Sequence, residues 1–105
     1  MKLLHVGVPI PYEKRGADVT YIADMKLAVS DPEAHPFHLE FISFDPDSPA
    51  PDIMKHTIHI AYEVDDVTAA LAQCDEIVLP LQDIGPELLA FGLKDGALLE
   101  LIHTK

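Results

Sequence analysis

One stretch of the sequence decides the fold: Leu88-Leu-Ala-Phe-Gly-Leu-Lys-Asp-Gly-Ala-Leu-Leu-Glu-Leu-Ile-His103. Two apolar segments, 88–93 and 97–103, flank the tripeptide Lys94-Asp-Gly96. An Asp-Gly pair between such segments is a strong short-range signal for a β-hairpin, because both residues tolerate the left-handed backbone of a tight turn. The sequence therefore predicts two antiparallel strands joined by a short turn.

The residues before this hairpin complete the second half of the chain. Strands are predicted over 57–64 and 76–81 from their apolar and β-branched residues. Between them, Asp65 and Asp66 precede the alanine-rich segment 67–74. An aspartate in that place caps a helix and complements its dipole. The second half is therefore expected to be β-α-β-β-β.

The first half contains similar strands but a weaker helix signal. Strands are predicted over 2–9, over 20–30 as one bent or two short strands, and over 37–44. Residues 11–18 contain Pro, Lys-Arg and Gly without helical periodicity, so a loop or at most one helical turn is expected there. Three prolines and three acids in residues 45–52 predict a connector between the halves.

The two halves repeat each other at their first and last strands. His5-Val-Gly-Val-Pro-Ile10 aligns with His59-Ile-Ala-Tyr-Glu-Val64, and His38-Leu-Glu-Phe-Ile42 aligns with Leu98-Leu-Glu-Leu-Ile102. Each half thus opens with a strand that carries a histidine and closes with one that carries a glutamate. The aligned histidines are 54 positions apart and the glutamates 60, so the first half is shorter where a helix would stand.

Four of these strand residues are candidate metal ligands: His5, Glu40, His59 and Glu100. They fall out of phase with the apolar residues that would pack beneath the strands, and they are predicted to share one face. Taken singly, a strand histidine is usually satisfied by the backbone or by water, and a strand glutamate is usually solvated. Their joint occurrence at repeat-equivalent positions favours a site for one divalent cation, which imidazole and carboxylate ligands suit.

The other titratable residues have different expected roles. His38 is in phase with Glu40 and could act as an acid–base group or support a metal ligand. Tyr62 is expected to pack, and the single Cys74 is expected to be a small buried apolar residue rather than a nucleophile. Surface or loop positions are predicted for the remaining histidines, His35, His56 and His103.

Composition argues against two classes of partner. Seven basic and eighteen acidic residues give a net charge of −11, which repels nucleic acid and anionic membranes. No segment approaches the ~20 apolar residues that span a bilayer. The apolar run 3–10 lacks a signal-peptide cleavage pattern, so a cytoplasmic location is predicted.

The residues around the candidate ligands resemble those of bacterial glyoxalase I and its relatives in the vicinal oxygen chelate superfamily. The resemblance is closest over 56–105 and local over 1–9 and 37–48, whereas residues 10–35 lack the first helix of the family. It is carried by Met1-Lys-Leu-Leu-His5, by Thr57-Ile-His59-Ile-Ala running into Val-Asp-Asp, and by Asp95-Gly-Ala-Leu-Leu-Glu100-Leu-Ile.

The resemblance implies an α+β fold in which two β-α-β-β-β modules form a cup-like open barrel, the first with a reduced or missing helix. It implies one glyoxalase-like domain over 1–105, with module one over 1–48, a connector over 45–55 and module two over 56–105. In that superfamily the first and last strands of each module supply the metal ligands, positions held here by His5, Glu40, His59 and Glu100.

The activity implied is that of a metal-dependent lyase or isomerase, which removes a proton next to a carbonyl of a small chelated substrate. The implied cofactor is one divalent ion (Ni, Co, Zn, Mn or Fe). Glu100, Glu40 and His38 are the predicted catalytic residues, with Glu100 the more essential carboxylate. The isolated cationic pair Lys14-Arg15 disfavours anionic glutathione or coenzyme A conjugates.

Two alternatives stay open. One is a non-catalytic protein of the same fold that binds or sequesters a ligand, which the truncated first module favours. The other is a ferrous extradiol-type oxygenase, which uses two histidines and one glutamate and would leave Glu40 without its expected role. A homodimer is expected from the family and from the open sheet edges of so small a chain.

Overall fold

A computed structural model describes the whole chain, residues 1–105. The fold is α+β, as predicted, with eight strands and two α-helices. The residues form two compact units, a N-terminal unit of residues 5–58 and a C-terminal unit of residues 1–4 with 59–105. Each α-helix has five residues, and no helix is long and apolar enough to cross a membrane.

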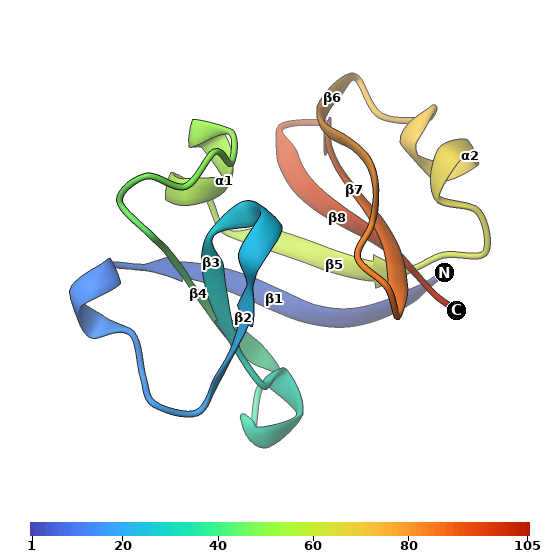
Figure 1. The fold of residues 1–105 in the computed structure, drawn as a ribbon. Helices are drawn as coiled ribbons and strands as arrows, with labels where there is room; N and C mark the ends of the chain where they lie inside the picture. Colours follow the sequence, from blue (N-terminus) through green and yellow to red (C-terminus); the bar gives the residue numbers. More distant parts are fainter. The chain divides into compact units, whose positions relative to one another are not determined.

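The C-terminal unit has the predicted β-α-β-β-β order. Its strands lie in the order β5-β8-β7-β6 (Figure 1). Strand β5 runs parallel to β8, whereas β7 is antiparallel to both β8 and β6. The elements are β5 (His59–Glu63), α2 (Val67–Leu71), β6 (Glu76–Asp83), β7 (Glu87–Lys94) and β8 (Ala97–Thr104).

The predicted hairpin joins β7 to β8. Lys94 pairs with Ala97, so Asp95 and Gly96 alone form the loop. Both have positive φ, 51° for Asp95 and 83° for Gly96, which is the backbone that a tight hairpin turn needs. The local residues therefore fix the register of this strand pair without help from the rest of the chain.

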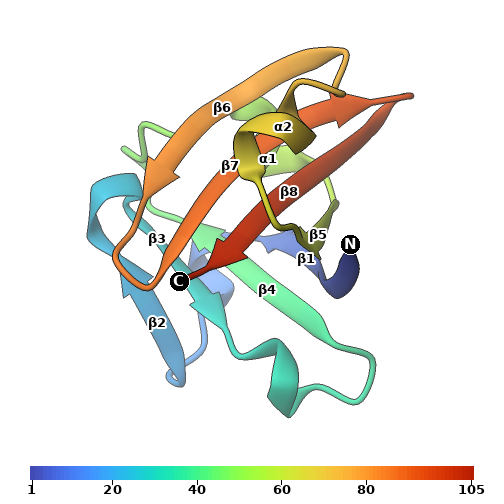
Figure 2. The same ribbon diagram turned by 90° about the vertical axis from the view of Figure 1, so that its right-hand side faces the viewer.

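Helix α2 covers one face of the C-terminal sheet, over β7 and β8 (Figure 2). Asp66 caps it as predicted, since its Oδ1 accepts a hydrogen bond from the Ala69 amide at 3.1 Å. The helix ends at Leu71, before the predicted end at residue 74. Tyr62 and Cys74 pack against the core beneath it, as predicted; this core consists of Val64, Val67, Leu71, Ala90 and Leu101.

The N-terminal unit has the same strand connectivity. Its order is β2-β3-β4-β1, with β1 parallel to β4 and β3 antiparallel to both β4 and β2. In each unit, therefore, the first strand lies parallel beside the last one. The elements are β1 (Lys2–Ile10, of which residues 5–10 belong to this unit), β2 (Val19–Ile22), β3 (Leu27–Ser30), β4 (Leu39–Phe44) and α1 (Asp52–His56).

The N-terminal unit has no helix between its first two strands. A single 3₁₀ turn, Tyr12–Lys14, stands there, in agreement with the expectation of at most one turn. Arg15 ties this segment to β4 instead: its guanidinium donates to the Ser43 hydroxyl at 2.7 Å and to the Ser43 carbonyl at 2.8 Å. The predicted strand over 20–30 is two short strands, β2 and β3.

Two strands begin later than predicted, and one helix was not predicted. Strand β4 begins at Leu39 rather than Phe37, because His38 has a φ of 54° and its amide donates to the His35 carbonyl in a turn. Strand β5 begins at His59 rather than at residue 57. Helix α1 was not expected so close to three prolines, but Pro51 precedes its first residue, where no amide donor is required.

Candidate metal centre

The first and last strands of the N-terminal unit bring His5 and Glu40 together. The Nε2 atom of His5 lies 3.3 Å from Oε1 of Glu40. In the parallel pairing of β1 with β4, Glu40 is the partner of Gly7, two residues beyond His5. Residues two apart on a strand point to the same face, and such diagonal neighbours are within reach of long side chains.

The C-terminal unit contains an equivalent pair, His59 and Glu100. Nε2 of His59 lies 3.1 Å from Oε1 of Glu100. Glu100 is the partner of Ala61, again two residues beyond the histidine. The repeat recognised in the sequence is therefore also a repeat of register and of side-chain contact within each unit.

The two histidines lie on the more buried face of β1 and β5, whereas the face away from the apolar packing was predicted for them. His59 and Ala61 are buried, whereas the alternate residues Ile60 and Tyr62 are half-buried. The same holds in β1, where His5 and Gly7 are buried and their neighbours are not. The polar side chains are thus shielded from water, and each needs a partner inside the protein or a bound ligand.

An aromatic ring adjoins the C-terminal pair. The ring of Phe91 contacts His59 edge-on, with centroids 5.0 Å apart and an interplanar angle of 82°. Phe91 is also the strand partner of Glu100 across the hairpin. It was not singled out in the sequence, although the two-residue turn at Asp95-Gly96 already places it opposite Glu100.

The four side chains are chemically suited to a divalent ion. Each offers one ligating atom, an imidazole nitrogen or a carboxylate oxygen. With bonds of about 2.1 Å, neighbouring ligand atoms around an octahedral or tetrahedral ion lie about 3.0 to 3.4 Å apart. The separations within the two pairs, 3.3 and 3.1 Å, fit adjacent ligands of one ion.

A direct contact between a protonated histidine and the carboxylate would give the same distance and would also compensate the charge. Burying an ionised carboxylate costs several kcal/mol unless opposite charge compensates it. A divalent ion beside a shielded glutamate would compensate its negative charge while leaving the neighbouring imidazole neutral. The residues present therefore fit a metal of the predicted kind.

The structure does not place His38 in a strand with Glu40. His38 is exposed and lies in the turn before β4, where its positive φ interrupts the alternation from which its orientation was inferred. His35 contacts Phe41 at a centroid distance of 5.7 Å, and His56 is exposed at the end of α1. His103 is half-buried, with Nδ1 3.0 Å from the Val64 carbonyl oxygen.

Arg15 and Cys74 have structural rather than chemical roles in this structure. Arg15 lies 2.8 Å from Asp45 and stacks over Tyr12 at 4.8 Å, so it clamps its own loop. Burial raises the pKa of the Cys74 thiol. A thiol with a raised pKa is a poor nucleophile, which agrees with the packing role expected for Cys74.

Comparison with known proteins does not assign a family or a function to this chain. Comparisons of the chain with protein-family models, with curated proteins and with solved structures found no match. A function must therefore be inferred from the two His–Glu pairs and from the other features of this chain.

Proposed function

We propose that the protein is a metal-dependent lyase or isomerase of the glyoxalase-like type. His5, Glu40, His59 and Glu100 would together bind one divalent ion, and the two units would form the cup-like open barrel around it. The observation that carries this proposal is the recurrence of one His–Glu contact at the same strand register in each of the two units.

The donor set bears on the identity of the metal. Two imidazoles and two carboxylates suit ions of intermediate softness, whereas magnesium and calcium prefer oxygen ligands alone. Ni, Co, Zn, Mn and Fe are therefore the candidates. A bound ion of this kind would hold two neighbouring substrate oxygens and stabilise negative charge as a C–H bond breaks.

The chain itself supplies the base. A glutamate beside the bound substrate can accept a proton from the carbon next to the carbonyl. Glu100 is the better candidate, because it is buried and because its strand partner Phe91 packs against the adjacent His59. Glu40 lacks such an aromatic partner across β3, since the β3–β4 pairing ends at Ile42. Glu40 would mainly hold the metal.

The proposal is tested by counting metal ions in protein purified without chelators and by titrating metal-free protein with zinc. One ion per chain is expected, bound more tightly than micromolar. His59→Ala should abolish this binding, because an incomplete shell cannot repay the dehydration of the ion. The matched control His103→Ala removes a half-buried imidazole of β8 and should leave the stoichiometry unchanged.

Two zinc ions per chain would mean that each His–Glu pair binds an ion by itself. If the protein binds no zinc, the two pairs are only hydrogen bonds. Either result would contradict a four-ligand site. A screen of α-hydroxycarbonyl compounds then tests the reaction, and a screen of catechols tests the oxygenase alternative. Turnover of a catechol with uptake of oxygen would overturn the lyase or isomerase proposal.

One observation favours a second candidate, a non-catalytic protein that binds or sequesters a ligand. The segment between β1 and β2 is a 3₁₀ turn and loop, where the C-terminal unit has a helix. This second candidate would be supported if the protein bound a metal and a small molecule but did not exchange the α-protons of that molecule with solvent.

A further inference from the structure

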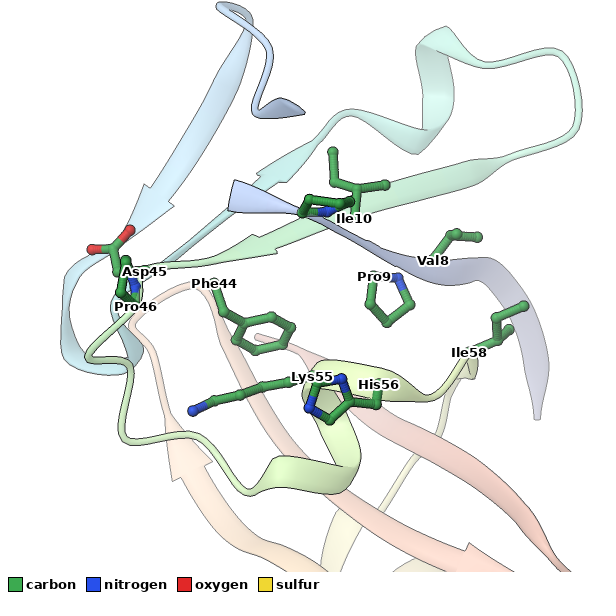
Figure 3. Close-up of a pocket in the computed structure, with 10 residues that line it drawn as sticks. Val8, Pro9, Ile10, Phe44, Asp45, Pro46, Lys55, His56 and Ile58 are labelled. Carbon is green, nitrogen blue, oxygen red and sulfur yellow. The ribbon is translucent and has the colours of Figure 1, made fainter. Parts of the chain in front are cut away.

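A pocket of about 660 Å³ lies within the N-terminal unit, beside the ends of β1 and β4 and helix α1 (Figure 3). Seven of its ten lining residues are apolar. Figure 3 shows Pro9 and Phe44 facing Lys55 and His56 across a common space. This size and this mixture of apolar walls with a few polar groups are typical of sites for small molecules.

The charges around the pocket are unequal. Asp45 is already compensated: Oδ1 lies 2.8 Å from Arg15, and Oδ2 accepts a hydrogen bond from the Tyr21 hydroxyl at 2.5 Å. The hydrogen bond from Tyr21, reinforced by Arg15, lowers the pKa of Asp45, so this carboxylate is ionised and bound. Asp45 therefore contributes little net charge to the pocket.

The ammonium group of Lys55 has hydrogen-bond donors available for a ligand. Its ammonium donates to the Ser48 carbonyl at 2.8 Å, and the nearest carboxylate, Asp52, is 3.9 Å away with a side chain that is 92% exposed. An ammonium group has three hydrogens to donate, so one bond to Ser48 leaves two for a ligand. His56 can add a further polar contact at the pocket.

We infer that this pocket binds a small apolar monocarboxylate. Its hydrocarbon or aromatic body packs against Pro9, Phe44 and Ile58, and its carboxylate accepts hydrogen bonds from Lys55. A chain with net charge −11 repels anions at long range, so an anion is retained only where a local cation outweighs that field. One ammonium without a guanidinium fork or a glycine-rich loop suits a single negative charge better than a phosphate.

None of the proposed metal ligands lines the pocket, although one lining residue, Ile58, precedes His59 in the chain. Pro9 and Phe44 lie four residues beyond His5 and Glu40 on their strands, about 13 Å at the usual rise per residue. The inference therefore does not rest on the metal, and it can be tested on metal-free protein.

The experiment is an NMR titration of the isotope-labelled, metal-free chain with phenylacetate and with phenylacetamide, which has the same shape without the charge. Saturable shifts are expected for amides within 8–11, 44–46 and 55–58. Phenylacetate should bind at least about 10-fold more tightly than the amide. Lys55→Met should weaken phenylacetate roughly 10- to 100-fold, the value of a hydrogen bond to a charged group.

Two further variants are controls. Lys94→Met removes an exposed lysine from the end of β7 and should leave affinity unchanged. Lys55→Arg keeps the charge and should retain most of the binding. Equal affinity for acid and amide in the wild type would overturn the inference, even if Lys55→Met failed to fold. Saturable shifts confined to amides outside the pocket would also overturn it.

The same titration separates this inference from the metal proposal. Phenylacetate that binds only after zinc is added, with shifts within 59–61 and 99–101 and none within 8–11 or 44–46, would overturn the pocket and support the metal site. Saturable binding at the pocket in a protein that takes up no metal would support the pocket and overturn the metal site.

Discussion

Nε2 of His59 lies 3.1 Å from Oε1 of Glu100, and the histidine side chain is 1% exposed. The His5–Glu40 contact in the other unit has the same register. A metal ligand must be deprotonated, so protons compete with the ion for each imidazole. This competition gives the proposed site a measurable dependence on pH.

Zinc affinity should decrease as the pH falls through the range in which free histidine titrates, around 6.5. The measurement is calorimetric titration with zinc from pH 8 to pH 5, in buffers of different ionisation enthalpy that also report the protons released. An affinity that stays constant over this range would identify carboxylate or backbone ligands and exclude both histidines.

Glu100→Gln and Glu40→Gln should separate catalysis from metal binding. Glutamine keeps the shape and one oxygen of glutamate but is not a useful base. Glu100→Gln should lose about 10²- to 10⁴-fold in turnover, the usual contribution of a general base. Glu40→Gln should lose mainly metal affinity. The measurement is deuterium exchange at the α-carbon of a turned-over substrate.

Wild-type exchange rates in both glutamine variants would show that neither carboxylate is the base. In that case the proposed proton transfer is wrong, and the ligand-binding candidate becomes the better one. Metal content must be determined for each variant, so that lost catalysis is not confused with a lost ion.

Glycine is required at position 92 by the packing of Cys74. A Cβ atom there would lie 2.6 Å from Cys74 Sγ and 2.9 Å from its Cβ, so side chains must shift. Gly92→Ala should therefore destabilise the protein by about 1 to 3 kcal/mol, as overpacking of a core does. The control Gly16→Ala has no atom within 4 Å and should be nearly neutral. Urea denaturation measures both, and equal stabilities would contradict the close contact.

Glu63 should make stability depend on acid pH. The Thr104 hydroxyl donates to Oε1 of Glu63 at 2.6 Å, and this bond lowers the pKa of the carboxyl below its ordinary value of 4.5. A lowered folded-state pKa contributes stability above the unfolded-state pKa, and this contribution is lost as the pH falls through the folded-state value. Stability should therefore decline below about pH 4.5 because of this group.

Thr104→Val isolates this contribution. It should cost about 1 kcal/mol at pH 7 and progressively less as the pH falls through the folded-state pKa of Glu63, because protonation removes the charged acceptor. Urea denaturation of both proteins across this range is the measurement. A cost that stays the same from pH 7 down to the acid limit of the folded state would show that the hydroxyl acts through packing rather than through the charged carboxylate.

Local chemistry in the sequence was enough to predict several elements. Asp95-Gly96 specifies the β7–β8 hairpin because both residues accept the positive φ of its turn. Asp66 specifies the start of α2 because its carboxylate accepts a hydrogen bond from the exposed amide of Ala69. Both features depend on residues close together in the chain, and such signals can be recognised without the tertiary structure.

Only the tertiary structure decided which residues meet across parallel strands. His5 and Glu40 are 35 positions apart, and their contact depends on the register that pairs Gly7 with Glu40. No turn joins parallel strands directly, so packing of the whole unit sets this register. For the same reason the sequence revealed neither the turn that removes His38 from β4 nor the pocket at Lys55, since both depend on contacts between distant segments.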